Sequence, residues 1–427
     1  MGSRWKKPVA ASLAGALALG GLAACGNESG SGGGDDDVIT LSYWKSADTG
    51  RPDFEAFMKI VNKFNDEHED IQLDVNTTPN DDYRTRLNTR AAGGDLPDVF
   101  QVWPGAELRP LVEAGAVEPI DDIEDHWLDS GLLEEGSFDE FTIEDNTYAV
   151  PVNSNPTHFI YYNKEMLSEA GHDSFPEDYE GFLQLIEDLK DEDVTPISLG
   201  NSGGWVLQSV YISTIADRFT GPDFLEDVEN GDRKFTDPEF IQGLEVIEEL
   251  NNMEAFNTDL NTIDSMQMID QFLQEESAMV MDGNWAATEI IENKQEDQEI
   301  GLATIPLGER NSISNTMGSA SAINSDISDE KKEAAKEFLK WLYNEELFEE
   351  LQAVGRIVPT NVENPNDELD PLIKEMMELT QEAENAPVYD ATLTPSLNDE
   401  LENQLQALTL GEATPEEIGE ALQKEVE

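Results

Sequence analysis

The sequence predicts an α/β protein, because stretches with strand periodicity alternate with stretches that have helix periodicity. Apolar residues alternate with polar ones at 39–43 and 71–75, as in half-buried strands. Apolar side chains three or four positions apart at 54–61 and 83–91 are typical of amphipathic helices, and 99–103 is a continuous apolar run. This β-α-β-α-β order indicates a mainly parallel sheet, whose ligands bind beyond the carboxyl ends of the strands.

The first 24 residues predict a processing signal and not a folded element. A basic start precedes the apolar run Pro8–Gly21, which is too short to span a bilayer. The next residues, Leu22–Cys25, have the pattern of a bacterial lipobox, in which the cysteine becomes the lipidated (palmitate-bearing) N-terminus. The alternative is an ordinary signal peptide with an incidental cysteine. Two or three acyl chains on Cys25 would give stable membrane anchoring, where a single chain is marginal.

Residues 25–37 predict a flexible tether, because glycine, serine and aspartate follow the cysteine without an apolar side chain to bury. Cys25 is the single cysteine of the chain, so the fold has to be stable without disulfides.

The net charge of −67 excludes nucleic acid as a partner, because phosphate binding needs clusters of lysine and arginine. Repulsion between so many carboxylates destabilises a compact state at low salt. Concentrated salt screens that repulsion, so the composition points to a halophilic source and an acidic, solvated surface.

Residues 148–163 predict a passage of the chain from one lobe to another. The extended run Tyr148–Val152 leads into the polar stretch Asn153–Pro156, and a second extended run follows at Phe159–Tyr162. Two prolines within six positions exclude a helix here. A helix is expected to start at Pro176, because apolar residues at 182–189 follow with helical spacing.

The remainder of the chain continues the α/β pattern. Strands are predicted at 196–199 and 301–306, and a strand followed by a turn at 277–285. Ser328 is a predicted N-cap, and Thr414–Glu417 combines a capping box with proline at the first helical position.

Several short motifs together resemble a known family. They are Gly94…Pro97-Asp98, Tyr148…Pro151, Tyr162-Asn163-Lys164, Ala170-Gly171, Ala278-Met279…Gly283…Trp285 and Gly355…Pro359-Thr360. In this combination they resemble the extracellular solute-binding proteins of carbohydrate ABC transporters, the family that includes maltose-binding protein. One departure is Asp178-Tyr179, where the family pattern has Thr-Trp at a helix start.

The resemblance implies the two-lobed periplasmic-binding-protein fold of type II, in which each lobe is a mainly parallel sheet flanked by helices. The chain would cross between lobes near residues 152, 318 and 366. The implied domains are a signal peptide (1–24), a tether (25–37), an N-terminal lobe (38–152 plus 319–365) and a C-terminal lobe (153–318 plus 366–427).

The tryptophans are the best candidates for ligand contact. Four of the seven, Trp44, Trp103, Trp205 and Trp285, come just after predicted strand ends, beside glycine, asparagine and aspartate. Flat rings suit the apolar face of a sugar, and a few polar groups suit its hydroxyls. Core packing is the alternative for any tryptophan. Trp127 and Trp341 do not share this context, and we expect Trp341, which lies within a predicted helix, to be structural.

The resemblance adds further candidates. It implies that Trp285 and Trp205 stack on the sugar. It also implies ligand contacts by the acids Asp48 and Glu107 and by Asn155 and His158 of the crossing segment. The full predicted ligand-binding set is Trp44, Asp48, Trp103, Glu107, Asn155, His158, Trp205, Trp285, Gly318 and Arg356. A surface role is the alternative for Arg356, and Asp98 is expected to be a structural turn residue.

An enzyme is the competing class. Gly200-x-Ser202-x-Gly204 fits the nucleophile elbow of hydrolases, but such enzymes carry their histidine after the serine, and all four histidines precede Ser202. Pairs of carboxylates for glycoside hydrolysis are inevitable among 92 acidic residues, so they do not discriminate. The histidines lack metal-ligand spacing, so we expect no metal and no cofactor.

The resemblance therefore implies a binding protein and not an enzyme. A monomer, anchored to the outer face of the cell membrane by its lipid, would capture a sugar by hinge closure and deliver it to the permease subunits of an ABC importer. An oligosaccharide is the expected ligand. A secreted carbohydrate-active hydrolase and the same fold with a non-sugar solute, such as a glycerol phosphodiester or a polyamine, are the alternatives.

We predict that the thermal unfolding midpoint rises when NaCl increases from about 0.01 M to about 1 M. The screening length between exposed carboxylates falls over that range from about 30 Å to about 3 Å. Calorimetric melts across the salt series measure the effect. A midpoint that stays flat or falls would contradict the halophilic origin.

Overall fold

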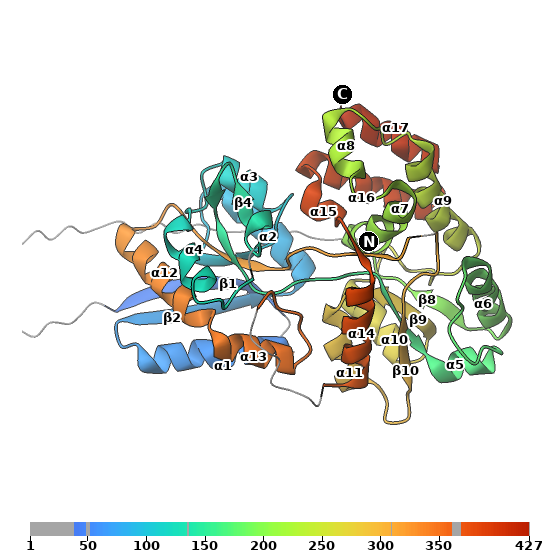
Figure 1. Ribbon diagram of the computed structural model, residues 1–427, viewed down its shortest axis with the longest axis horizontal. Coiled ribbons are helices and arrows are strands. Elements are labelled where there is room, and N and C mark those ends of the chain that lie inside the picture. Colours follow the sequence, from blue (N-terminus) through green and yellow to red (C-terminus); the bar gives the residue numbers. More distant parts are fainter. Residues whose placement is uncertain (1–37, 48–51, 135, 309, 361–368, 427) are drawn as a thin grey trace, which may run out of the picture. The chain divides into compact units, whose positions relative to one another are not determined.

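Two mixed β-sheets, each flanked by helices, form the body of the protein in the computed structural model (Figure 1). The structure describes residues 38–47, 52–134, 136–308, 310–360 and 369–426. The predicted signal peptide, Cys25 and the tether therefore lie outside the described residues. We refer to each sheet with its helices as a lobe.

The sheet of the first lobe combines strands from distant parts of the sequence. Its spatial order is β2 (Ile71–Thr78), β1 (Ile39–Ser46), β3 (Val99–Val102), β12 (Ala320–Ile323) and β6 (Ala149–Pro151). β1 is parallel to β2 and β3, whereas β12 is antiparallel to β3 and β6. The chain forms β12 on its return from the second lobe. It therefore enters the sheet from the edge near that lobe, and β12 runs opposite to β3 and β6.

The sheet of the second lobe has the order β10 (Ile300–Ala303), β7 (Phe159–Asn163), β9 (Ser277–Asp282) and β8 (Thr195–Ser198). β8 and β9 are parallel, but β7 is antiparallel to both β9 and β10. The prediction of mainly parallel sheets was wrong in this respect. The α/β class and the two lobes are confirmed, but the strands next to the crossings between lobes run against their neighbours.

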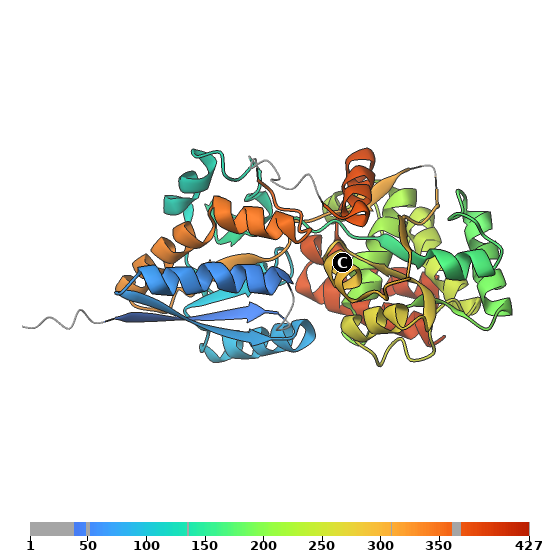
Figure 2. The ribbon, with the colours of Figure 1, turned by 90° about the horizontal axis from the view of Figure 1, so that it is seen from below.

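Helices cover both sheets, and Figure 2 shows α1 running along the strands of the first one. The first lobe contains α1 (Pro52–Glu67), α2 (Asn80–Gly93), α3 (Leu108–Glu113), α4 (Asp121–Leu128), α12 (Asp329–Leu342) and α13 (Glu345–Ala353). The second contains α5 (Lys164–Glu169), α6 (Tyr179–Asp191), the π-helix η2 (Val206–Ile212), α7 (Ser213–Thr220), α8 (Phe224–Asn230), α9 (Pro238–Asn252), α10 (Ser265–Leu273), α11 (Trp285–Asn293), α14 (Pro371–Glu382), α15 (Tyr389–Thr392), α16 (Pro395–Thr409) and α17 (Pro415–Val426). Two short pairs of strands complete the fold, β11 (Ser312–Ser314) with β13 (Glu384–Ala386) and β4 (Thr142–Ile143) with β5 (Asn146–Thr147). The 3-10 turn η1 (Asp139–Phe141) directly precedes β4.

Capping residues set the helix boundaries. Ser328 caps α12 by accepting a bond from the amide of Lys331, as predicted. The helix expected at Pro176 begins later, at Tyr179, because the Asp178 side chain accepts a hydrogen bond from the Gly181 amide and acts as the N-cap. Aspartate therefore supplies a cap where the family pattern has threonine.

Trp127 and Trp341 pack in the first lobe and not in a loop. Trp127 is fully buried in the first lobe and donates its indole N–H to the Tyr343 carbonyl at 2.8 Å. Trp341 packs edge-on against Phe64, with 5.2 Å between ring centroids. Trp127 belongs to the apolar cluster between the sheet and the helices of the first lobe, and Trp341 is partly buried against that cluster.

Two crossing segments are hydrogen-bonded to each other between the lobes. Val152 donates to the Ser319 carbonyl at 3.0 Å, and Gly318 donates to that of Asn153 at 2.6 Å. Asn155 donates to the Thr316 carbonyl at 2.9 Å. The predicted crossings near 152 and 318 thus form one paired ribbon, and the predicted crossing near 366 lies outside the described residues.

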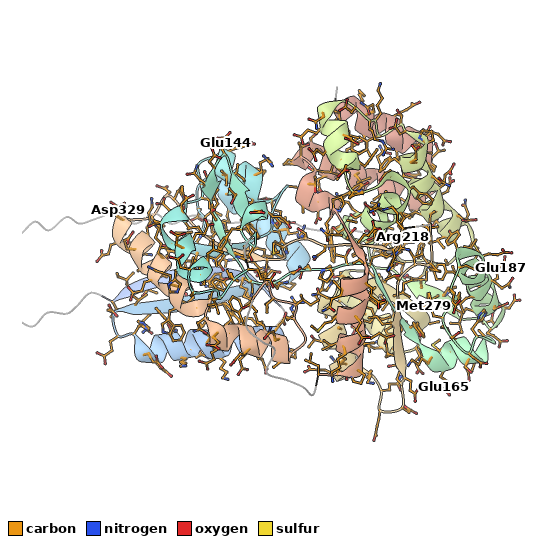
Figure 3. The ribbon with its side chains drawn as sticks, viewed as in Figure 1. Glu144, Glu165, Glu187, Arg218, Met279 and Asp329 are labelled. Atoms are coloured by element: carbon orange, nitrogen blue, oxygen red, sulfur yellow. The ribbon has the colours of Figure 1, made fainter. Side chains whose placement is uncertain are left out.

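Acidic side chains cover the surface of both lobes. Glu144, Glu165, Glu187 and Asp329 are exposed, whereas Arg218 and Met279 lie inside the second lobe (Figure 3). Among the described helices, none has the length and apolar character needed to span a membrane.

We predict that Trp127→Phe lowers the free energy of unfolding by about 1–3 kcal/mol, because the buried Tyr343 carbonyl loses its indole donor. Urea titration in molar salt measures the loss. Trp341→Phe is the matched control, with a smaller effect expected because Trp341 is only partly buried. Equal losses in the two variants would contradict the assigned role of the indole bond.

Candidate functional site

A cavity of about 590 Å³ lies between the two lobes and is the candidate site. Residues at the ends of β1, β3 and β9 line it, together with the ribbon of crossing segments and the start of α11. Its position at strand ends follows the rule for ligands of open α/β sheets. Residues of both lobes and of the ribbon therefore line one site.

Two indole rings form the aromatic part of the second-lobe wall. Trp205 and Trp285 lie with ring centroids 6.0 Å apart and an interplanar angle of 54°. Trp285 begins α11 directly after β9, and its ring lies over Gly283, where a Cβ would overlap it. Glycine at 283 is therefore required for this ring position.

Polar groups flank the indoles in the same wall. Asp282 ends β9, is 1% exposed, and accepts a hydrogen bond from the Gly283 amide at 2.9 Å. Ser209 on η2 also lines the cavity, and its hydroxyl is one of the buried groups in the described chain without a hydrogen-bond partner. Such groups can bind ligand hydroxyls.

Lys45 is a basic residue of the first-lobe wall of the cavity. It follows Trp44 near the end of β1 and donates to Gln101 Oε1 on β3 at 3.0 Å. Its ammonium also lies 4.7 Å from the centre of the Phe57 ring. Burial lowers the pKa of Lys45 to about 8, although the nearby Asp53 carboxylate opposes that shift.

Arginines at two points of the cavity are paired with carboxylates. Arg356, from the segment after α13, lies 3.3 Å from Asp53 on α1. Arg84 on α2 lies 2.8 Å from Glu107, and its guanidinium stacks 4.7 Å from the centre of the Trp103 ring. Burial raises the pKa of Glu107, and the Arg84 charge opposes that shift.

Comparison with known proteins identifies the family. The model for bacterial extracellular solute-binding proteins matches residues 30–347. The chain belongs to this family.

Relatives and solved structures agree with this assignment. The multiple sugar-binding protein of Streptococcus mutans is 25% identical over 340 residues, which cover 75% of this chain and 74% of the relative. The melibiose/raffinose/stachyose-binding protein MelE of Bacillus subtilis is 23% identical over 271 residues, or 61% of this chain and 60% of the relative. A solved chitin oligosaccharide binding protein superposes with a TM-score of 0.82 at 26% identity, covering 91% of this chain and 98% of that chain. The two-lobed fold of the family is thereby confirmed.

The structure of this solute-binding protein brings five of the predicted residues together. Trp103, Asn155, Trp205, Trp285 and Arg356 all line the cavity. Two more lie directly behind lining residues. Glu107 pairs with Arg84, and Gly318 packs so closely on Asn153 and Asn155 that a Cβ would overlap both side chains.

Trp44 was also expected in the cavity, but it is not among the described residues that line it. Its ring lies against α2, 3.7 Å from the Arg86 guanidinium and 5.9 Å from that of Arg90. Successive side chains of a strand point to opposite faces, so the exposure of Lys45 to the cavity turns Trp44 the other way.

His158 is placed in the interior of the second lobe instead of the cavity. It is 0% exposed, and its Nδ1 lies 2.8 Å from the Val210 carbonyl. Burial lowers the pKa of His158 to about 3, so the ring is neutral and structural. Asp48 lies outside the described residues.

The sequence analysis of the solute-binding protein missed several lining residues. Lys45 and Gln101 come from neighbouring strands, and only their cross-strand pairing identifies them. Asp282 could have been found, since it precedes the glycine of the Ala278-Met279…Gly283…Trp285 motif. Ser202 of the elbow-like motif also lines the cavity, but no histidine does so among the described residues.

We predict that the unfolding free energy of wild type, relative to Lys45→Met, increases as pH rises from about 8 to about 10.5. Burial lowers the pKa of Lys45 from 10.5 to about 8, so in this range the unfolded chain holds a proton that the folded protein has released. Denaturant titrations at several pH values measure the difference.

Lys59→Met is the control for this pH series. The hydrogen bond to Glu350 raises the pKa of Lys59, so wild type should show no such gain relative to that variant. If the difference in unfolding free energy between wild type and Lys45→Met stays flat or decreases with pH, the pKa of Lys45 is not lowered in the folded protein.

Proposed function

We propose that the protein is an extracytoplasmic solute-binding protein that captures an oligosaccharide and delivers it to an ABC importer. The observation that carries this proposal is the pair Trp205 and Trp285, which share one cavity with Asp282 and the hydrogen-bonding groups of the opposite lobe. Indole faces match the C–H face of a sugar ring, and carboxylate, amide and hydroxyl groups match its rim.

The chemistry of the cavity favours a ligand with many hydroxyls over an anion, because acidic residues outnumber basic ones among the described lining residues. Its arginines are engaged by carboxylates, Arg84 with Glu107 and Arg356 with Asp53, and its lysine by an amide. The volume of about 590 Å³ is within the range of small-molecule sites. The relatives named for the binding of multiple sugars and of melibiose, raffinose and stachyose support an oligosaccharide.

We propose that the ligand contacts are Trp103, Asn155, Trp205, Trp285 and Arg356, with Lys45 and Asp282 added from the geometry. The lobes would close over the sugar by bending at the ribbon of crossing segments, and the closed form would present itself to the permease. The lobe boundaries proposed for this motion are 38–152 plus 319–365 and 153–318 plus 366–427. Binding requires no bond to be made or broken.

The cellular setting is also part of the proposal. A monomer would be anchored through lipidated Cys25 to the outer face of the membrane, and the tether to residue 37 would hold the lobes clear of the lipid. The lipobox-like pattern and the acidic composition support an anchored protein from a high-salt environment.

A binding screen in molar salt tests the function. Thermal shift followed by calorimetric titration would cover chitotriose, xylotriose, maltotriose and stachyose, with spermidine and glycerol phosphodiesters as non-sugar solutes. Saturable binding of at least one oligosaccharide is expected. Binding confined to the non-sugar solutes, or hydrolysis of an oligosaccharide by the pure protein, would reject the proposal.

We predict that Trp285→Ala weakens sugar binding at least tenfold, or by about 1.4 kcal/mol, because the ring loses its stacking contact. Trp44→Ala is the matched control, since that ring packs on Arg86. Its affinity should remain within about twofold of wild type, a difference well below that 1.4 kcal/mol step. Unchanged affinity in Trp285→Ala would remove this residue from the site.

A further inference from the structure

In addition to the ribbon of crossing segments, the two lobes touch directly beside the cavity. The loop after β3 meets α15, where the Ala106 amide donates to the Asp390 carbonyl at 3.2 Å. Gly105 in this loop has φ +65°, and a Cβ there would overlap the Ala391 carbonyl. This position therefore needs glycine for its backbone conformation and for the approach of the second lobe.

Arg84 lies at the centre of this contact and also lines the cavity. Its Nη1 atom is 2.8 Å from Glu107 in its own lobe and 3.9 Å from Asp390 in the other. These three side chains are 22%, 15% and 19% exposed, so the charges interact with reduced solvent screening. The same guanidinium stacks 4.7 Å from the centre of the Trp103 ring.

We propose that Arg84 is a positioning residue that couples the placement of Trp103 for sugar stacking to the approach of the two lobes through Asp390. The coupling rests on the proposed sugar-binding function. Stacking fixes the ring where the sugar would contact it, and the same cation attracts the carboxylate that the second lobe brings to the interface.

The carboxylates around Arg84 explain why a cation is needed here. Glu107 and Asp390 would face each other across the lobe contact if the guanidinium were absent. Glu402 on α16 is a third acid that interacts electrostatically with Arg84 and Asp390. Burial raises the pKa of Glu402 to about 7, the Arg84 charge opposes that shift and the Asp390 charge adds to it. Without Arg84 the second lobe would approach against like charge.

Arginine suits both tasks better than lysine. A planar guanidinium can stack on an indole and still direct N–H groups to carboxylates in its plane, whereas an ammonium is a compact, strongly hydrated charge. Arg84→Lys should therefore restore the attraction to Asp390 but only part of the positioning of Trp103.

A double-mutant cycle tests the coupling, using the panel oligosaccharide that wild type binds most tightly. Arg84→Met and Asp390→Asn should each weaken binding about tenfold, mainly through faster dissociation. The double variant should lose no more than about the larger single loss, because both changes remove one interaction. Arg84→Lys should recover part of the affinity.

Arg86→Met is the matched control, because Arg86 lies on the same helix and also stacks on an indole, that of Trp44. The sugar affinity of Arg86→Met should stay within about twofold of wild type. In free energy, a twofold change is under a third of a tenfold change. Additive losses in the cycle, or an equal loss in Arg86→Met, would overturn the proposal, because both would show a general effect of removing charge.

Small-angle X-ray scattering of the sugar-free proteins tests the contact between the lobes without any ligand. Arg84→Met, Asp390→Asn and Gly105→Ala should each increase the radius of gyration over wild type, and Arg86→Met should leave it unchanged. Scattering curves that superpose for all five proteins would overturn the link between lobes, even where sugar binding is intact. If no panel sugar binds but the radii change as expected, the proposed function fails while the contact between lobes stands.

Discussion

The ribbon formed by the two crossing segments is the constraint on which the site depends. Backbone hydrogen bonds between 152–157 and 314–319 join the two crossing segments, and side-chain bonds such as that of Ser154 to Asn315 add to them. Gly318 allows this pairing because a side chain there would overlap Asn153 and Asn155. A thin, hydrogen-bonded connection can bend while each lobe keeps its own core, and this is what capture by closure requires.

Charge is distributed differently in the cavity and on the surface. Outside, carboxylates greatly outnumber cations, and exposed pairs such as Lys59 with Glu350 contribute little stability. Inside, Arg84 and Arg356 each meet a carboxylate at reduced exposure. Acidic residues also outnumber basic ones among the described residues that line the cavity. The cavity is therefore unsuited to an anion, and its hydrogen-bonding groups suit a ligand rich in hydroxyls.

Much of the fold could be predicted because it is written in local patterns. Alternation identified β1 and β2, helical spacing identified α1, and Ser328 marked the start of α12. The direction of β7 and β12 could not be predicted, because strand polarity depends on how the chain re-enters a sheet after crossing between lobes. The start of α6 was missed by three residues because a side-chain cap, at Asp178, outweighed the proline signal.

For the site, the sequence by itself determined the residue types, the family resemblance and the segments that carry Trp103, Trp205 and Trp285. Only the tertiary structure decided which neighbour faces the ligand, as with Lys45 in the cavity and Trp44 against Arg86. Alternation along a strand specifies that adjacent side chains point to opposite faces, but the packing of α2 and the second lobe chooses which face is the cavity. The meeting of Arg84 with Asp390 has the same origin, since charges 306 positions apart are brought together only by the approach of the lobes.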